Sequence, residues 1–304
     1  MLVVFLYLSA CLLPLAGLFF VLTLPTFMFL ISVFNGWAKT MNAFFTAIVA
    51  IFAILSFTHT FFPLLVPAAA GLSGMVMARI MKLNPSIEAL VLFPSLVCLA
   101  AITAFFGLIG IELGMNIIEV VKKYVSEAVD LNIGFYARLP LKPEEIKAIQ
   151  DSKDGIIDFL ARLFPAICTI SVLSVIWLNV LLIGRILGEK TVKPYVFSDL
   201  SQWKTPPWLV WVFIAAAAMI MLSHTYLRFA GINIFLVASF LYLLQGLAIV
   251  SFFFQSKNIS MFFRVIIYFL IAVQQLLMVA IALVGLFDLW VDFRKYFRKD
   301  QATG

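Results

Sequence analysis

The sequence predicts an all-α protein, a polytopic transmembrane bundle of about eight membrane spans. Of its 304 residues, 64% are hydrophobic and only 12% are charged, whereas a soluble domain is nearer half apolar and a quarter charged. The mean hydropathy is +1.12, and apolar runs of roughly 20 residues, the length that crosses a bilayer, recur along the chain. The surface of the folded protein must therefore face lipid.

The charged and reactive residues exclude several function classes. Although the pI is near 9.2, Lys and Arg lie at the ends of apolar runs, as membrane topology signals do, so the lipid bilayer and no nucleic acid is the expected partner. No Walker A loop, GxSxG elbow or HExxH motif is present, and we expect no catalytic residues and no enzyme. Cys11, Cys98 and Cys168 occur singly, so no metal site or cofactor is expected. Apolar sequence begins at Met1 without a basic leader, and the first segment is expected to be retained.

Residues 2–34 form one uncharged run that is too long for a single straight span. The stretch Thr23–Thr26 has the character of a turn, so we expect the break there. The prediction is a full span over residues 2–22 and a short segment over 26–36. That segment is either a short or re-entrant half-helix that lines a cavity, or a short, tilted span.

Further spans are expected over about residues 42–58, 63–81 and 85–113. In the middle one of these, small residues recur at three- and four-residue spacing and share a face that includes Ala70, Gly74 and Ala78. A face of small residues lets two helices approach closely. It serves either internal packing or the docking of a helix from another membrane subunit.

Residues 114–158 are the sizeable stretch of mixed charge in the chain. They divide it into N-terminal membrane helices over 1–113, a connecting segment over 114–158, and C-terminal membrane helices with a short basic tail over 159–304. A helical period in the first part of the segment predicts an amphipathic helix, and a second short helix is expected to begin at Pro143. The segment is either a solvated linker or a platform for a partner.

The C-terminal membrane helices carry most of the polar residues that lie inside apolar runs. A span over about 159–187 contains Pro165 and Asn179, and three passes follow between Pro207 and Lys299. Polar side chains are costly in hydrocarbon and are functional candidates by default. The candidate ligand-binding residues are His224, Tyr242, Gln245, Arg264 and Gln275, and we expect the last four to line one internal seam. The seam either walls a ligand or ion pathway or holds the bundle together.

The end of the final pass holds two acids, Asp288 and Asp292, one turn apart. The helix dipole disfavours negative charge there, and the two charges repel each other, so a cation must compensate. Because Arg228 ends a pass on the same expected side, the sequence predicts a structural ion pair between Arg228 and one of these acids. The basic tail predicts a cytoplasmic C-terminus, and residues 114–158 are expected on the same side.

Three stretches of the C-terminal third, Gly231–Asn233, Leu241–Ala248 and Gly285–Arg294, resemble the YybS-like family of bacterial multi-pass membrane proteins of unknown function. Leu24-Pro25 followed by Asn35-Gly36 is similar to the first hairpin of that family, so the likeness covers the whole chain. The resemblance implies a distant relation to the substrate-binding S components of energy-coupling-factor vitamin transporters and to the rod-shape protein MreD. S components usually have six spans, are shorter and lack the 114–158 insertion, and the resemblance implies no binding residue.

Two hypotheses of function follow from these patterns. The first is a transport component of the bacterial cytoplasmic membrane that binds a small molecule and depends on separate energising subunits. The second is an assembly or scaffold protein that transports nothing and works through residues 114–158 and the tail. An intramembrane enzyme ranks third, because no nucleophile–base pair is apparent.

Overall fold

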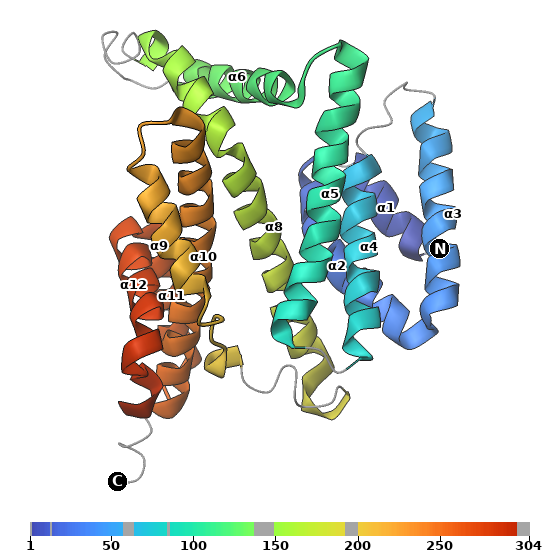
Figure 1. Ribbon diagram of the computed structural model, residues 1–304. Helices are drawn as coiled ribbons and strands as arrows, with labels where there is room; N and C mark the ends of the chain where they lie inside the picture. The colour runs from blue at the N-terminus through green and yellow to red at the C-terminus, as the bar shows by residue number, and fades with distance from the viewer. Residues whose placement is uncertain are drawn as a thin grey trace. The chain divides into compact units, whose positions relative to one another are not determined.

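The computed structural model describes residues 2–12, 14–56, 64–83, 86–136, 149–191 and 200–296. Every regular element within these ranges is a helix, which confirms the predicted all-α class (Figure 1). The helices form two compact units, Met1–Val196 and Phe197–Gly304, here called the first and the second unit. The span over residues 159–187, grouped by sequence with the C-terminal helices, lies in the first unit.

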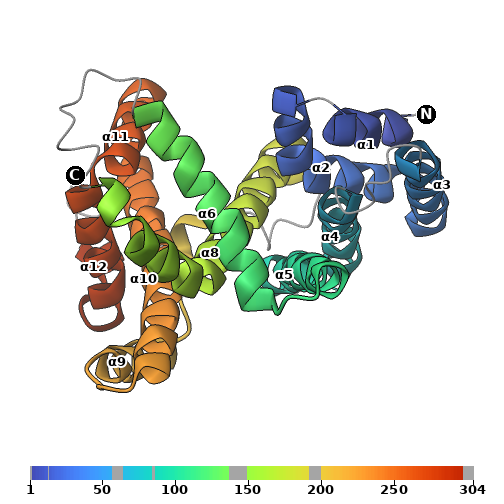
Figure 2. The same ribbon diagram turned by 90° about the horizontal axis from the view of Figure 1, so that it is seen from above.

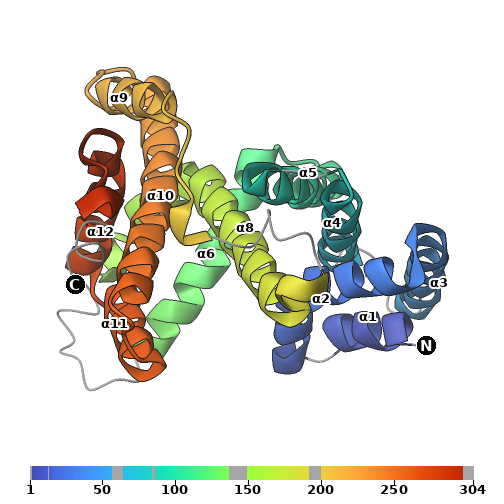
Figure 3. The ribbon, with the colours of Figure 1, turned by 90° about the horizontal axis from the view of Figure 1, so that it is seen from below.

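The first unit contains α1 (Leu2–Leu12), α2 (Pro14–Asn35), α3 (Trp37–Ser56), α4 (Leu65–Met81), α5 (Ile87–Leu113), α6 (Ile117–Tyr136) and α8 (Lys153–Thr191). The second contains the short 3-10 helix η2 (Leu200–Gln202), α9 (Leu209–Ile220), α10 (Thr225–Ser256), α11 (Met261–Val273) and α12 (Gln275–Val291). Seen from below, α8 runs beside α2 and α5 (Figure 3).

Five of the described helices, α2, α3, α5, α8 and α10, are long and apolar enough to cross a membrane. Helices α11 and α12 meet at a bend of 103° and supply a sixth if they count as one broken span. Helices α4 and α9 are apolar but shorter. By length, the described helices thus provide five or six of the about eight spans expected.

The first break in the chain falls earlier than the sequence suggested. Helix α1 ends at Leu12 and α2 begins at Pro14, where proline fits the first helical position because its missing N–H is not needed there. Helix α2 then continues through Pro25 to Asn35. The predicted break at Thr23–Thr26 and the separate short or re-entrant helix over 26–36 are therefore wrong, and a polar side chain from α8 explains why.

The small-residue face of α4 is used within the first unit. Ala70, Gly74 and Ala78 are buried, and a Cβ added to Gly74 would overlap the backbone of Pro25 in α2. Only glycine permits so close an approach of two backbones. The face is therefore used for internal packing, and docking of a helix from another subunit on it stays a prediction.

The amphipathic helix of the connecting segment is present as α6. It turns away from α5 at Gly114, whose φ of 65° closes α5 in the left-handed region, and it crosses the ends of α5 and α8 (Figures 1 and 2). Val120 and Val121 are buried, whereas Leu131 and Phe135 are exposed. The helix expected from Pro143 begins outside the described residues.

Candidate functional site

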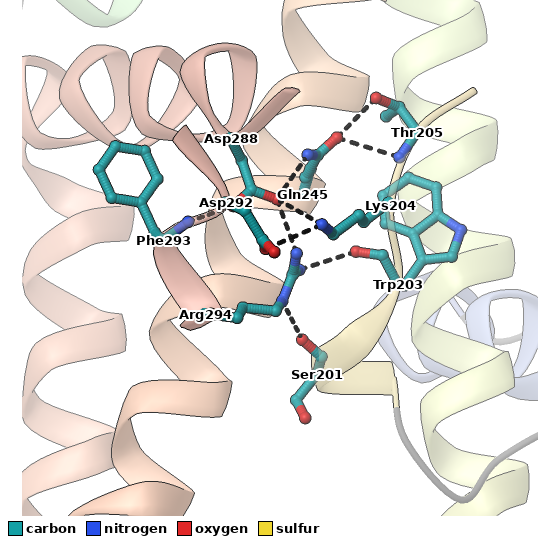
Figure 4. A network of polar contacts seen from close by, with 9 residues as sticks. All are labelled: Ser201, Trp203, Lys204, Thr205, Gln245, Asp288, Asp292, Phe293 and Arg294. Atoms are coloured by element: carbon teal, nitrogen blue, oxygen red, sulfur yellow. Dashed lines mark hydrogen bonds and ion pairs between the residues drawn. The ribbon is translucent and has the colours of Figure 1, made fainter. Parts of the chain in front are cut away.

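The second unit holds a buried network of polar contacts around Asp288, here called the Asp288 network (Figure 4). Its members come from η2 and the segment after it, from α10, and from the end of α12 and the turn that follows. They are Ser201, Trp203, Lys204, Thr205, Gln245, Asp288, Asp292, Phe293 and Arg294.

An ion pair between Asp288 and Arg294 forms the centre of the network. Nη1 of Arg294 lies 2.7 Å from Oδ2 of Asp288, and the two side chains are 2% and 0% exposed. The guanidinium also donates to the carbonyls of Ser201 (3.0 Å from Nε) and Trp203 (2.9 Å from Nη2). Burying two charges is favourable only when such additional hydrogen bonds satisfy them. These bonds tie the turn after α12 to η2 and to the residue that follows it.

The backbone after α12 places Arg294 against this acid. Asp292 has a φ of 45°, in the left-handed region that aspartate tolerates better than most residues. The turn ends the helix and directs the chain back, so that the N–H of Phe293 donates to Oδ1 of Asp288 at 3.0 Å. Asp292 itself pairs with Lys204 at 3.0 Å, where both side chains are about half exposed.

Gln245 links α10 to the same network. Its side-chain oxygen accepts from the N–H of Thr205 (3.0 Å) and from the Thr205 hydroxyl (2.5 Å), and its Nε2 donates to Oδ2 of Asp288 (3.1 Å). Close approach of α10 and α12 permits this, because a Cβ added to Gly285 would overlap the backbone of Tyr242. With its oxygen engaged twice, Gln245 serves the bundle as a hydrogen-bonding bridge.

The predicted ion pair between Arg228 and Asp288 or Asp292 is wrong. Helix α9 ends at Ile220 and α10 begins at Thr225. Arg228 therefore lies in the first turn of α10 and does not end a pass. It is exposed, and its guanidinium carbon lies 5.8 Å from the ring centroid of Phe229. The compensating cations that the two acids require are Arg294 and Lys204.

The other candidate residues do not line one seam. His224 and Gln275 are exposed at the starts of α10 and α12. Arg264 donates to the carbonyl of Ile259 (2.8 Å), in the turn after α10, and to that of Phe254 (3.2 Å), which also accepts from the Ile259 N–H, and so it holds this turn. Tyr242 is buried against Phe213. The seam prediction treated the final pass as one straight helix. Helices α11 and α12 meet at a bend of 103°, so Arg264 and Gln275 do not lie on one helix face.

A second buried polar group lies in the first unit, at Asn179 of α8. Its Oδ1 accepts from the N–H (3.0 Å) and the hydroxyl (2.6 Å) of Thr26, and its Nδ2 donates to the carbonyls of Leu22 (2.8 Å) and Val175 (2.7 Å). In a regular helix the Thr26 N–H would bond the Leu22 carbonyl. The Asn179 amide bonds both groups, and so satisfies them in the turn that the Pro25 ring disturbs.

Next to this bridge lies a cavity of about 170 Å³, here called the apolar cavity. Four helices of the first unit line it, α2, α4, α5 and α8, and it is open on one side. Its lining residues are Val21, Leu22, Pro25, Val66, Ala69, Ala70, Cys98, Ala101, Ile102, Ser171, Val172, Val175 and Ile176. Sequence reasoning missed this site, because its lining is almost wholly apolar and contains no charged residue.

Comparison with models of protein families identifies a family for the chain. The model of the family described as "Predicted membrane protein (DUF2232)" matches residues 1–289. The chain belongs to this family. Membership in DUF2232 agrees with the YybS-like resemblance and with an integral membrane protein. No curated protein and no solved structure matches significantly.

The DUF2232 match covers all of the apolar cavity and part of the Asp288 network. It includes Gln245 and Asp288 but ends before Asp292 and Arg294. Within this DUF2232 protein the two sites differ in chemistry. The network is polar and is engaged in bonds within the protein, whereas the cavity offers shape and apolar surface.

Proposed function

We propose that this DUF2232 protein is a small-molecule-binding component of a membrane transport system that is energised by separate subunits. The observation that carries the proposal is the apolar cavity, which lies midway along three helices long enough to span a membrane. Binding sites in helical membrane proteins form between helices at this depth. The YybS-like resemblance to S components supports the same role.

In this proposal the Asp288 network has a structural role. Its ion pair, the Gln245 bridge and the Ser201 and Trp203 carbonyls hold together α10, α12, η2 and the segment after η2. Ligand binding is then a property of the first unit. This location differs from the one expected from the polar residues of the C-terminal passes.

Affinity purification of the tagged full-length protein from its native membrane tests the proposal. A transport component should bring with it an ATPase and a membrane coupling subunit in fixed ratio. Recovery of cell-wall or division proteins in place of these would overturn the transport role. The variant Ala101→Phe fills the cavity, because Ala101 lines it. It should keep these partners, since the substitution lies in the cavity wall.

A scaffold role is the alternative, and helix α6 is the observation that favours it. Leu131 and Phe135 are exposed on α6, beside charged residues such as Glu127 and Asp130. An amphipathic helix with such a face binds a membrane surface or a partner helix. Loss of copurifying proteins on Leu131→Ser, with the same fold by circular dichroism, would favour this alternative.

A further inference from the structure

We infer that the apolar cavity binds the end of a hydrocarbon chain of a membrane lipid. The inference rests on the proposed function, because it names the class of ligand for the cavity that carries that function. Three properties of the cavity support it: the chemistry of its lining, its volume and its depth along the helices.

The lining suits hydrocarbon. Among the described lining residues only Cys98 and Ser171 have polar side chains, and none is charged. The Asn179 amide nearby makes all its described bonds to Thr26, Leu22 and Val175. A polar ligand would lose its hydrogen bonds to water here without replacement, which is unfavourable. A hydrocarbon chain loses none.

The volume fits part of a lipid chain. The cavity measures about 170 Å³, and an apolar protein cavity of about 150 Å³ stays dry and holds benzene, a molecule of six carbons. The cavity therefore accommodates a similar number of chain carbons and excludes a whole lipid with its headgroup. An unfilled cavity of this size would lack dispersion contacts on its walls, so an occupant stabilises the first unit.

The depth places chain ends beside it. Cys98, Ala101 and Ile102 lie near the middle of α5, and the residues from Ser171 to Ile176 lie near the middle of α8. Val66 and Ser171 are exposed, so the cavity reaches the outer surface of the helices. The hydrocarbon core of a bilayer is about 30 Å thick, and the ends of acyl chains meet at its centre. A chain end can therefore enter sideways.

Photo-crosslinking with a phosphatidylcholine that carries a diazirine at the end of one chain tests the inference. The full-length protein is reconstituted in vesicles containing this lipid, irradiated and digested, and the labelled peptides are identified by mass spectrometry. Labelling should concentrate on the middle of α5 and α8. It should fall to background in Ala101→Phe, which fills the cavity, and fall partly in the milder Ala101→Leu.

The matched control is Ala100→Phe, because Ala100 is the neighbouring residue on the same helix, is exposed and does not line the cavity. It should label like the wild type. Equal labelling in Ala100→Phe and Ala101→Phe, or labels spread evenly over exposed helix faces, would overturn the inference. If Ala101→Phe fails to fold, Ala101→Leu decides between these outcomes. The copurification experiment is independent, so failure of the lipid to bind and failure of the transport role can be told apart.

Discussion

Removing Arg294 should be among the most damaging single substitutions in the second unit. In Arg294→Leu the carboxylate of Asp288, whose side chain is 0% exposed, loses its partner at 2.7 Å and remains buried. Breaking a buried ion pair on one side costs about 3–5 kcal/mol. The Ser201 and Trp203 carbonyls lose a donor as well, so we expect the upper part of that range. The measurement is the free energy of unfolding from sodium dodecyl sulfate titration in micelles, followed by circular dichroism.

A double-mutant cycle separates the charge from the shape of the side chain. Asp288→Asn removes the charge and keeps an oxygen for the N–H of Phe293, although its NH2 group replaces the Oδ2 that accepts from Gln245, which offsets part of the gain. The double variant Asp288→Asn/Arg294→Leu should therefore be more stable than Arg294→Leu alone, by about 2 kcal/mol. The control is Lys204→Leu, since Lys204 and Asp292 are 47% and 51% exposed and an exposed pair contributes about 0–1 kcal/mol. Lys204 Nζ also lies 3.9 Å from Oδ2 of Asp288, but in this variant Arg294, at 2.7 Å, still compensates that carboxylate. Equal losses in Arg294→Leu and Lys204→Leu, or additive losses in the cycle, would refute the reasoning.

Three further outcomes are expected. Asn179→Leu leaves the Thr26 N–H and the Leu22 carbonyl without the amide that bonds them. It should lower the free energy of unfolding by about 2–4 kcal/mol in the same titration, and a smaller loss would contradict this role of Asn179. Gly74→Ala should destabilise the protein, because its Cβ would meet the Pro25 backbone, whereas Gly107→Ala, which meets nothing within 4 Å, should be neutral or stabilising by up to about 1 kcal/mol. Cysteine reporters at Lys147 and Gln301 should both be labelled from the cytoplasmic side, and labelling from opposite sides would reject the predicted topology.

The helices themselves could be predicted from the sequence because their cause is local. Apolar runs of membrane-spanning length and the apolar period of α6 are properties of neighbouring residues. The break near the N-terminus could not. Pro14 and Pro25 both interrupt one apolar run, and the residue that lets α2 continue through Pro25 is Asn179, which is 153 positions from Thr26. Local sequence does not show which of the two prolines has a distant side chain that bonds the helix backbone beside it.

The candidate site was half predictable for a similar reason. Electrostatics required a cation for Asp288 and Asp292, and the structure contains two. The identity of the main partner depends on the left-handed turn at Asp292, which directs Arg294 back onto Asp288. The predicted partner was Arg228, because the prediction sought the cation at the end of another pass. The turn is a property of one backbone angle, and spacing along a helix does not reveal it.

The two buried amides show how a polar residue in a membrane helix can be assigned a role. Both Gln245 and Asn179 are costly in hydrocarbon and were open to a functional role on that ground. In the structure the oxygen of each accepts two hydrogen bonds from a single threonine, Thr205 or Thr26, and the nitrogen of each donates within the same unit. An amide so occupied can bind a ligand only by first releasing part of the fold. Under the proposed function, selectivity for a ligand would then come from shape and apolar contact, which the lining of the apolar cavity offers.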